Sequence, residues 1–97
     1  MAIQNGFPRP GGNASHLDIT AATLVKSSPG TIFTVSVVVA GSTVGAIYDH
    51  ATTSGVSAAS QIGVIPDTVG VYSFSFPCAV GIVVVPGTGQ TVSVAYS

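Results

Sequence analysis

The amino-acid sequence predicts one all-β domain, an antiparallel β-sandwich or jelly roll of about seven or eight strands. Three observations support this prediction. Apolar and polar residues alternate with a period of two, β-branched residues dominate the alternating runs, and Gly/Pro-rich turn signals separate the runs every ten residues or so. A chain of 97 residues has the length of a single domain.

The strongest alternation lies in segment 30–41 (GTIFTVSVVVAG) and segment 71–77 (VYSFSFP). Side chains that alternate in this way lie on opposite faces of a half-buried strand. In the first segment we expect the apolar face to comprise Phe33, Val35, Val37 and Val39, with Thr34 and Ser36 opposite and Ile32 and Val38 beside them. The side chains that we expect to be buried, in a core or an interface, are Tyr72, Phe74, Phe76, Phe33, Val35 and Val37.

Further strands are expected in the runs HLDITAATLVK, STVGAIYDH, QIGVIP, GIVVVP and TVSVAYS. The segment 51–63 between them is compatible with a short helical turn, although a strand edge fits it better. The turn signals SSPG at 27–30 and PGTGQ at 86–90 are typical of hairpin connections. We therefore expect the runs on either side of each signal to pair directly as antiparallel neighbours.

Residues 1–15 are expected to form an extended N-terminal arm, and residues 16–97 the β-sandwich domain. The arm contains two prolines and several glycines without periodicity, a composition that disfavours both helix and strand ladders. Two interpretations remain open. The arm is either a passive terminus or an interface element in which Ile3, Phe7 and Arg9 dock on a neighbouring subunit.

The composition favours contact with other protein subunits. Hydrophobic residues make up 46% of the chain and charged residues only 5%, and the net charge is −1. This composition excludes a disordered chain, a nucleic-acid-binding surface and a basic membrane-binding surface. Either hydroxyl and amide groups hydrate the surface or neighbouring subunits cover it, and the second interpretation fits the shortage of charge better. We expect a symmetric homo-oligomer, with a trimer as the first choice.

No motif predicts catalysis or cofactor binding. The segment PGTGQT at 86–91 resembles a phosphate-binding loop, but Gln90 stands where the lysine is needed and Val84 where the first glycine is needed. Asp49 and His50 are adjacent, so on a strand they point to opposite faces and should not act together. We expect them to face solvent or a neighbour at the end of a strand.

A metal site is not expected either, because the histidines and carboxylates are scattered along the chain. The single cysteine, Cys78, lies in an apolar stretch and is expected to be a small buried hydrophobic residue. We therefore predict that the protein is not an enzyme and has no catalytic, cofactor-binding or metal-binding residues. The first residues show no basic region followed by an apolar run, and no stretch approaches a membrane span. Synthesis and assembly in a cytosol are the expectation.

The segment 16–97 resembles small structural proteins of tailed bacteriophages and prophages. The resemblance lies in the overall sequence pattern and in the turn-containing segments AGSTVGAIYD and GIVVVPGTGQTVSV. It implies a β-sandwich and a place in the virion, most specifically as a capsid decoration or cement protein that binds and stabilises the phage head lattice. Other virion proteins, above all the major capsid protein, would be its partners.

Two alternatives accompany this expectation. The nearest is a head-fibre, neck or tail-surface structural protein. The other is a carbohydrate-binding attachment module, which would need exposed aromatic residues and clusters of Asp or Asn on loops. The sequence has no Trp and offers only Asp67 and Asn13 in this respect, which disfavours the second alternative.

Overall fold

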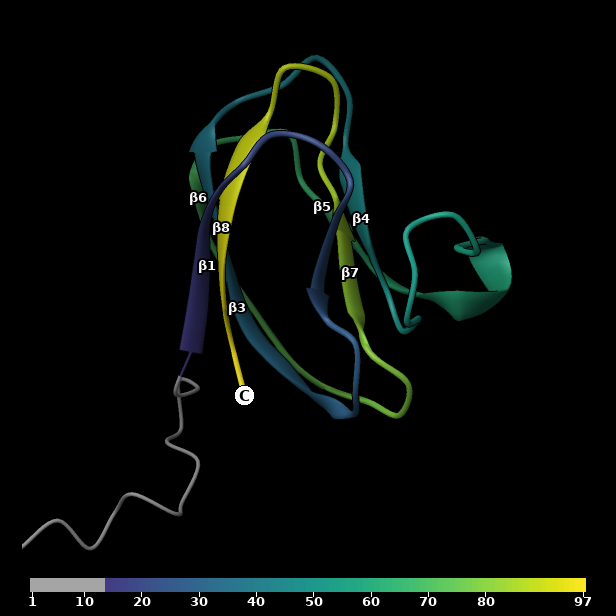
Figure 1. The fold of residues 1–97 in the computed structure, drawn as a ribbon. Helices are drawn as coiled ribbons and strands as arrows, with labels where there is room; N and C mark the ends of the chain where they lie inside the picture. The colour runs from purple at the N-terminus through teal and green to yellow at the C-terminus, as the bar shows by residue number, and fades with distance from the viewer. Residues whose placement is uncertain (1–13) are drawn as a thin grey trace, which may run out of the picture.

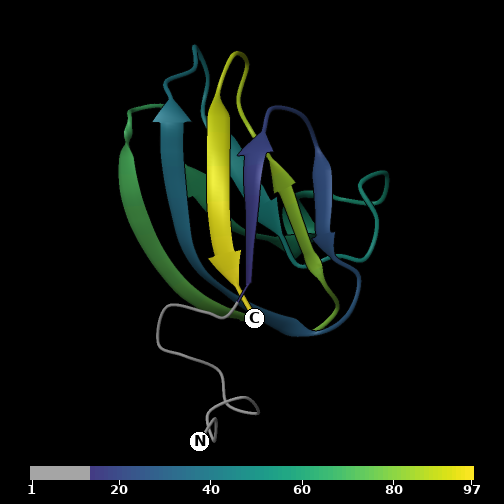
Figure 2. The same cartoon turned by 60° about the vertical axis from the view of Figure 1, so that its left-hand side comes forward.

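A computed structural model describes residues 14–97, and it confirms the predicted β-sandwich (Figure 1). The described elements are β1 (Ala14–Ile19), β2 (Thr23–Lys26), β3 (Gly30–Val39), β4 (Gly45–Tyr48), the 3₁₀ turn η2 (Ala58–Ser60), β5 (Gln61–Ile65), β6 (Gly70–Cys78), β7 (Ile82–Val85) and β8 (Thr91–Tyr96). The strands form two four-stranded antiparallel sheets that face each other (Figure 2). None of the helical structure in this part of the chain is long and apolar enough to cross a membrane.

The order of the strands is that of a jelly roll. The first sheet has the order β1-β8-β3-β6 and the second the order β2-β7-β4-β5. Four antiparallel pairs, β1·β8, β2·β7, β3·β6 and β4·β5, make up one nested ribbon. Curling this ribbon adds the pairs β3·β8 and β4·β7 and creates the two sheets. The fold thus belongs to an architecture that viral capsid and lectin domains share.

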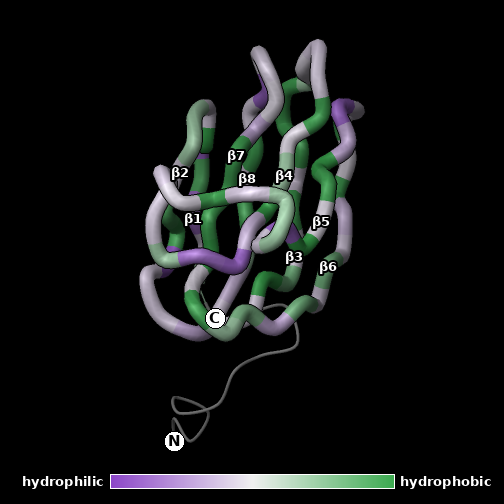
Figure 3. Tube along the Cα trace, turned by 90° about the vertical axis from the view of Figure 1, so that its right-hand side faces the viewer, coloured by the Kyte–Doolittle hydropathy of each residue, from purple (hydrophilic) through white to green (hydrophobic). Residues whose placement is uncertain are grey.

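The core lies between the two sheets and consists of aliphatic residues. Those from the first sheet are Ile19, Ile32, Val35, Val37, Val92 and Val94, and those from the second are Ile47, Ile65, Ile82 and Val84. Cys78 completes the cluster. In Figure 3 the strands are correspondingly green, whereas most of the connecting loops are pale or purple. Burial of β-branched side chains from both sheets supplies the main stabilisation of the fold.

A β-bulge in β3 changes the face that was expected for Phe33. Ile32 pairs with Tyr96 and Thr34 with Ala95 of β8, so Phe33 is one residue in excess. An extra residue reverses the alternation on one side of it. Ile32 therefore joins Val35 and Val37 in the core, while Phe33 is only half-buried. Val39, expected on the same apolar face, is 48% exposed.

The aromatic residues of β6 are less buried than expected. Tyr72 and Phe74 pack partly against the core, but Phe76 is 42% exposed. β6 is an edge strand that pairs with β3 alone, and its ladder is interrupted near Ser75, which has a φ of 49°. Because β6 lies at the edge of the sheet and contains this irregularity, its aromatic side chains have a neighbouring strand on one side only.

Both expected hairpins are wrong. The turn at 27–30 joins β2 of the second sheet to β3 of the first, and the turn at 86–90 joins β7 of the second sheet to β8 of the first. The run 16–26 is likewise divided between β1 and β2, which lie in different sheets. Among the described strands, only β4 and β5 are both consecutive and paired. A short turn reverses the chain equally well within a sheet and across the roughly 10 Å between two sheets.

Ala14 and Ser15, the last two residues of the expected arm, belong instead to the first strand. β1 begins at Ala14, where Ala14 and Ser15 pair with Tyr96 and Ala95 of β8. The rest of the expected arm lies outside the described residues.

Candidate functional site

The outer face of the first sheet carries two rows of mostly small, uncharged side chains. Across the sheet, Ser15, Ala95, Thr34 and Ser73 form one row of cross-strand neighbours, and Ser93, Ser36 and Val71 form the next. These side chains point outward because Val35 and Val37, which alternate with them, lie in the core. Short side chains lose little rotamer entropy when a partner covers them. The face is therefore suited to packing against another protein surface.

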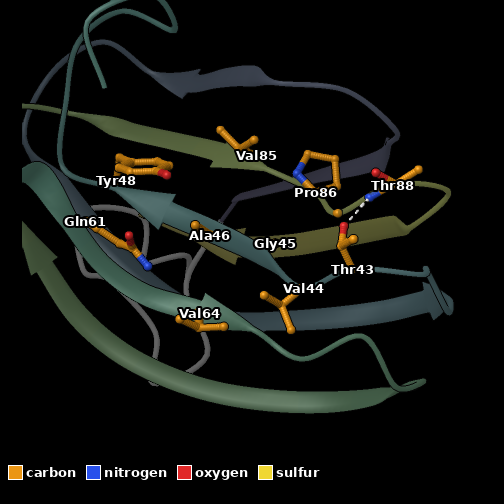
Figure 4. A pocket seen from close by; sticks show the side chains of 11 residues that line it. Thr43, Val44, Gly45, Ala46, Tyr48, Gln61, Val64, Val85, Pro86 and Thr88 are labelled. Atoms are coloured by element: carbon orange, nitrogen blue, oxygen red, sulfur yellow. Dashed lines mark hydrogen bonds between the residues drawn. The ribbon is translucent and has the colours of Figure 1, made fainter. Parts of the chain in front are cut away.

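A pocket of about 350 Å³ lies on the outer face of the second sheet (Figure 4). Its floor comes from three neighbouring strands, in which Ala46 of β4 pairs with Val64 of β5 and with Val85 of β7. The neighbouring residue Ile47 points into the core, so Ala46 faces outward. A small alanine between two valines leaves the hollow.

The walls of the pocket add an aromatic ring and a loop. Tyr48 and Gln61, which are register partners, lie at one end. At the other end lie Val44 and the loop from Pro86 to Thr88, and the Thr88 backbone N–H donates to Oγ1 of Thr43 over 2.9 Å (Figure 4). No charged residue lines the pocket. It can thus accept apolar or aromatic groups without desolvating an ion.

Gln90 fixes the loops beside this pocket and was not recognised as important in the sequence. Its side chain is buried, with 1% exposed. Its Oε1 accepts a hydrogen bond of 2.9 Å from the Gly87 N–H, and its Nε2 donates one of 2.7 Å to the Pro66 carbonyl. One amide therefore joins the β7–β8 loop to the β5–β6 loop. A glutamine after a PGTG turn, at the start of an alternating strand, is the only signal that the sequence carried.

Asp49 plays a corresponding part at the opposite end of the sandwich. Its carboxylate accepts hydrogen bonds from the backbone N–H groups of Ala79, Val80 and Gly81, over 2.9, 2.8 and 3.2 Å. Asp49 thus holds the β6–β7 loop of its own chain, a role that the sequence did not indicate. Burial by itself raises the pKa of Asp49, but these three donors, together with His50, outweigh it, and the pKa lies below its usual 3.8.

His50 lies in a separate local arrangement. Its Nδ1 is 3.1 Å from the Thr52 backbone nitrogen, and its ring lies close to Gly55. The hydrogen bonds of Asp49 go to the β6–β7 loop, whereas those of His50 go to Thr52. The two residues thus have separate structural partners. Within residues 14–97, no three His, Cys, Asp or Glu side chains come together as metal ligands would.

Cys78 is buried, as predicted, with 3% of its surface exposed. Burial, with a further contribution from the charge of Asp49, raises the pKa of this thiol to about 11. A thiol with such a pKa is almost entirely protonated near neutral pH and reacts slowly. We expect iodoacetamide to leave Cys78 unmodified in the native protein at pH 8 and to modify it after denaturation, as mass spectrometry would show. Rapid labelling of the native protein would contradict this placement.

The three interface residues predicted from the sequence, Ile3, Phe7 and Arg9, lie outside the described residues. The charged residues within the described range are confined to β1, the end of β2 and two loops, at Asp18, Lys26, Asp49 and Asp67. Strands β3 to β8 contain none. Large apolar side chains remain exposed at several places in the domain, including Leu17 of β1 at 66%, Val69 of the β5–β6 loop at 59% and Val71 of β6 at 72%.

Fold and surface together define an eight-stranded jelly roll in which strands β3 to β8 carry no charged residue and the second sheet has a pocket on its outer face. Comparison with protein-family models, with curated proteins and with solved structures finds no match to this chain.

Proposed function

We propose that this protein is a structural subunit of a virion, and specifically a decoration or cement protein that binds the head lattice of a tailed bacteriophage. The observation that carries the proposal is the absence of charge from strands β3 to β8, combined with exposed valine and leucine side chains on the same domain. Surfaces of this kind are typical of proteins that other subunits cover.

The binding mechanism would be burial of area and strand-edge hydrogen bonding, without any chemical step. The small hydroxyl-bearing and apolar side chains on the first sheet can pack closely against a partner at low entropic cost. Many copies on one particle would make contacts that are weak individually and strong together. The major capsid protein is the partner that this role implies, and a head-fibre, neck or tail-surface position is the nearest variant.

Copy number on purified particles tests the proposal. Quantitative mass spectrometry of virions from the phage that encodes this chain should find it in a fixed, high stoichiometry to the major capsid protein. A handful of copies per particle would favour the neck or tail variant. Absence from the particle, or recovery only from infected-cell lysate, would overturn a virion role.

Deletion of residues 2–12 should leave the sandwich folded and weaken attachment to particles. Full burial of a side chain such as Ile3 or Phe7 on a partner contributes about 1.5–3 kcal/mol, so roughly a tenfold or greater loss of affinity is expected. Circular dichroism would check the fold, and co-sedimentation with undecorated particles would measure the affinity. Equal binding by the truncated and full-length proteins would show that the arm is a passive terminus.

A carbohydrate-binding attachment module is the second candidate, because lectin domains share the jelly-roll architecture and Tyr48 and Gln61 stand at one end of the pocket. An aromatic ring beside an amide can contact a sugar. Saturable binding to a glycan array that is lost in Tyr48→Ala would favour this candidate over the structural role.

A further inference from the structure

We propose that the pocket on the outer face of the second sheet is a binding site for a neutral sugar. The inference rests on the second candidate function and names the class of ligand that the pocket accepts. Three features carry it: the mixture of apolar and polar groups in the lining, the lack of charge among the described lining residues, and the fixed loop that forms one wall.

The lining combines an apolar floor with polar groups at its edge. Ala46, Val64 and Val85 supply the floor, and the Tyr48 ring stands at one end of it (Figure 4). A pyranose ring has C–H groups on its faces and hydroxyl groups around its rim. One face of such a ring can therefore contact the aliphatic and aromatic carbons while its hydroxyls reach the polar groups at the edge.

The polar groups at the edge keep hydrogen-bonding capacity for a ligand. Thr43 Oγ1 accepts from the Thr88 N–H over 2.9 Å, and its own hydroxyl hydrogen remains available to donate. The Gln61 amide makes only a long contact of 3.5 Å, to the Gly63 carbonyl. The Tyr48 hydroxyl points over the floor from the same end of the pocket (Figure 4). Hydroxyls and a primary amide supply both donors and acceptors, which is the combination that sugar hydroxyls need.

Among residues 14–97, no charged residue lines the pocket, and this selects against acidic sugars. A carboxylate placed there would lose water without gaining a cationic partner, whereas a neutral hydroxyl exchanges water for the groups at the edge. The volume of about 350 Å³ lies near the lower limit for small-molecule sites, as one or two sugar rings require. Because the hollow is open on one side, a bound sugar keeps part of its surface in water, and we expect a Kd of about 1–10 mM.

The loop wall is held in place by the domain itself. Oε1 of the buried Gln90 accepts from the Gly87 N–H over 2.9 Å. The Ser42 N–H donates to the Thr88 carbonyl, also over 2.9 Å. Together with the bond from Thr88 to Thr43, these contacts fix the loop on both sides. A wall that is already ordered lowers the entropy cost of binding.

Titration of the ¹⁵N-labelled full-length protein with sugars, followed by NMR, tests the site. The neutral probes are glucose, galactose, mannose, N-acetylglucosamine and N-acetylgalactosamine. The acidic probes are glucuronic and galacturonic acid, which match two of the neutral probes except for a carboxylate at C6. We expect at least one neutral probe to shift the backbone amide signals of residues 43–48, 61–64 and 85–88 saturably, and the acidic probes to bind about tenfold more weakly or worse.

Two results of the titration would overturn the proposal. One is the lack of any saturable shift at these residues with all of the neutral probes. The other is equal binding of the best neutral probe and an acidic one, since the proposal attributes the selection to the uncharged lining.

Two pairs of variants sharpen the titration. Ala46→Phe fills the hollow and should weaken binding about tenfold or more, whereas Ala95→Phe alters an outward-facing alanine of the first sheet and should leave binding unchanged. Tyr48→Phe removes one hydroxyl and keeps the ring, so it should weaken binding about two- to tenfold, with Tyr96→Phe on β8 as its control. Circular dichroism would check the fold of all four. Wild-type affinity in Ala46→Phe would overturn the proposal, and if that variant does not fold, wild-type affinity in Tyr48→Phe would do so.

The outcome can be separated from that of the proposed functions. Binding to a glycan array that persists in Ala46→Phe would retain a carbohydrate-binding function and overturn this site. A chain that is abundant on virions and binds none of the neutral probes retains the structural role and loses the sugar site.

Discussion

Replacement of Gln90 by methionine should lower the free energy of unfolding by roughly 2–5 kcal/mol. Methionine has nearly the same volume, so the loss comes from the two hydrogen bonds rather than from a cavity. Each buried polar group left without a partner, here the Gly87 N–H and the Pro66 carbonyl, costs about 1–3 kcal/mol. For a domain of this size, a loss of that order lowers the melting temperature by roughly 10–30 °C.

Gln61 provides the matched control. It is an exposed glutamine at the start of β5 whose Nε2 makes only a long contact of 3.5 Å to the Gly63 carbonyl. Gln61→Met should change the free energy of unfolding by less than about 0.5 kcal/mol. Thermal and urea unfolding of the two variants beside the wild type would measure both effects. A Gln90→Met variant as stable as Gln61→Met would show that the buried amide does not fix the loops.

Replacement of Asp49 by asparagine should destabilise the domain by roughly 1.5–3 kcal/mol at neutral pH. An asparagine side chain has one carbonyl oxygen in place of two carboxylate oxygens, and its NH₂ group faces backbone N–H donors. The three hydrogen bonds from Ala79, Val80 and Gly81 therefore cannot all be kept. Hydrogen bonds to a charged group contribute more than neutral ones, which explains the size of the loss.

The same carboxylate makes stability depend on pH. The pKa of Asp49 is lowered in the folded protein relative to 3.8, so its contribution is complete above about pH 4. The contribution disappears as the pH falls through the lower folded-state value, because protonation removes the acceptor charge. Wild-type stability should thus fall below about pH 4, and the Asp49→Asn variant should show a flatter profile there.

Urea unfolding between pH 2 and pH 7 would test this dependence. Asp67→Asn is the control, since it removes the same negative charge from a different loop and leaves the acceptor of the three backbone N–H groups in place. An Asp49→Asn variant whose acid profile parallels that of the wild type would show that other groups cause the acid sensitivity.

The predicted burial succeeded where the alternation was uninterrupted and failed at the bulges. Val35 and Val37 lie in the core as expected, whereas Ile32 takes the place predicted for Phe33. Nothing in the letters GTIFTVSV marks the extra residue, because a bulge arises from the register between β3 and β8. The exposure of Phe76 likewise follows from the edge position of β6, which the pairing of distant strands decides.

Period-two alternation, β-branched runs and regular turn signals were sufficient to determine the all-β class, because these features act over a few residues. The burial of Cys78 was also predictable from its apolar surroundings. The pairing of β1 with β8 and of β2 with β7, the crossing of both predicted hairpins between sheets, the pocket around Ala46 and the roles of Gln90 and Asp49 came only from the tertiary structure. Each of these features joins residues that are far apart in the chain, and local propensity has no means of specifying which distant groups meet.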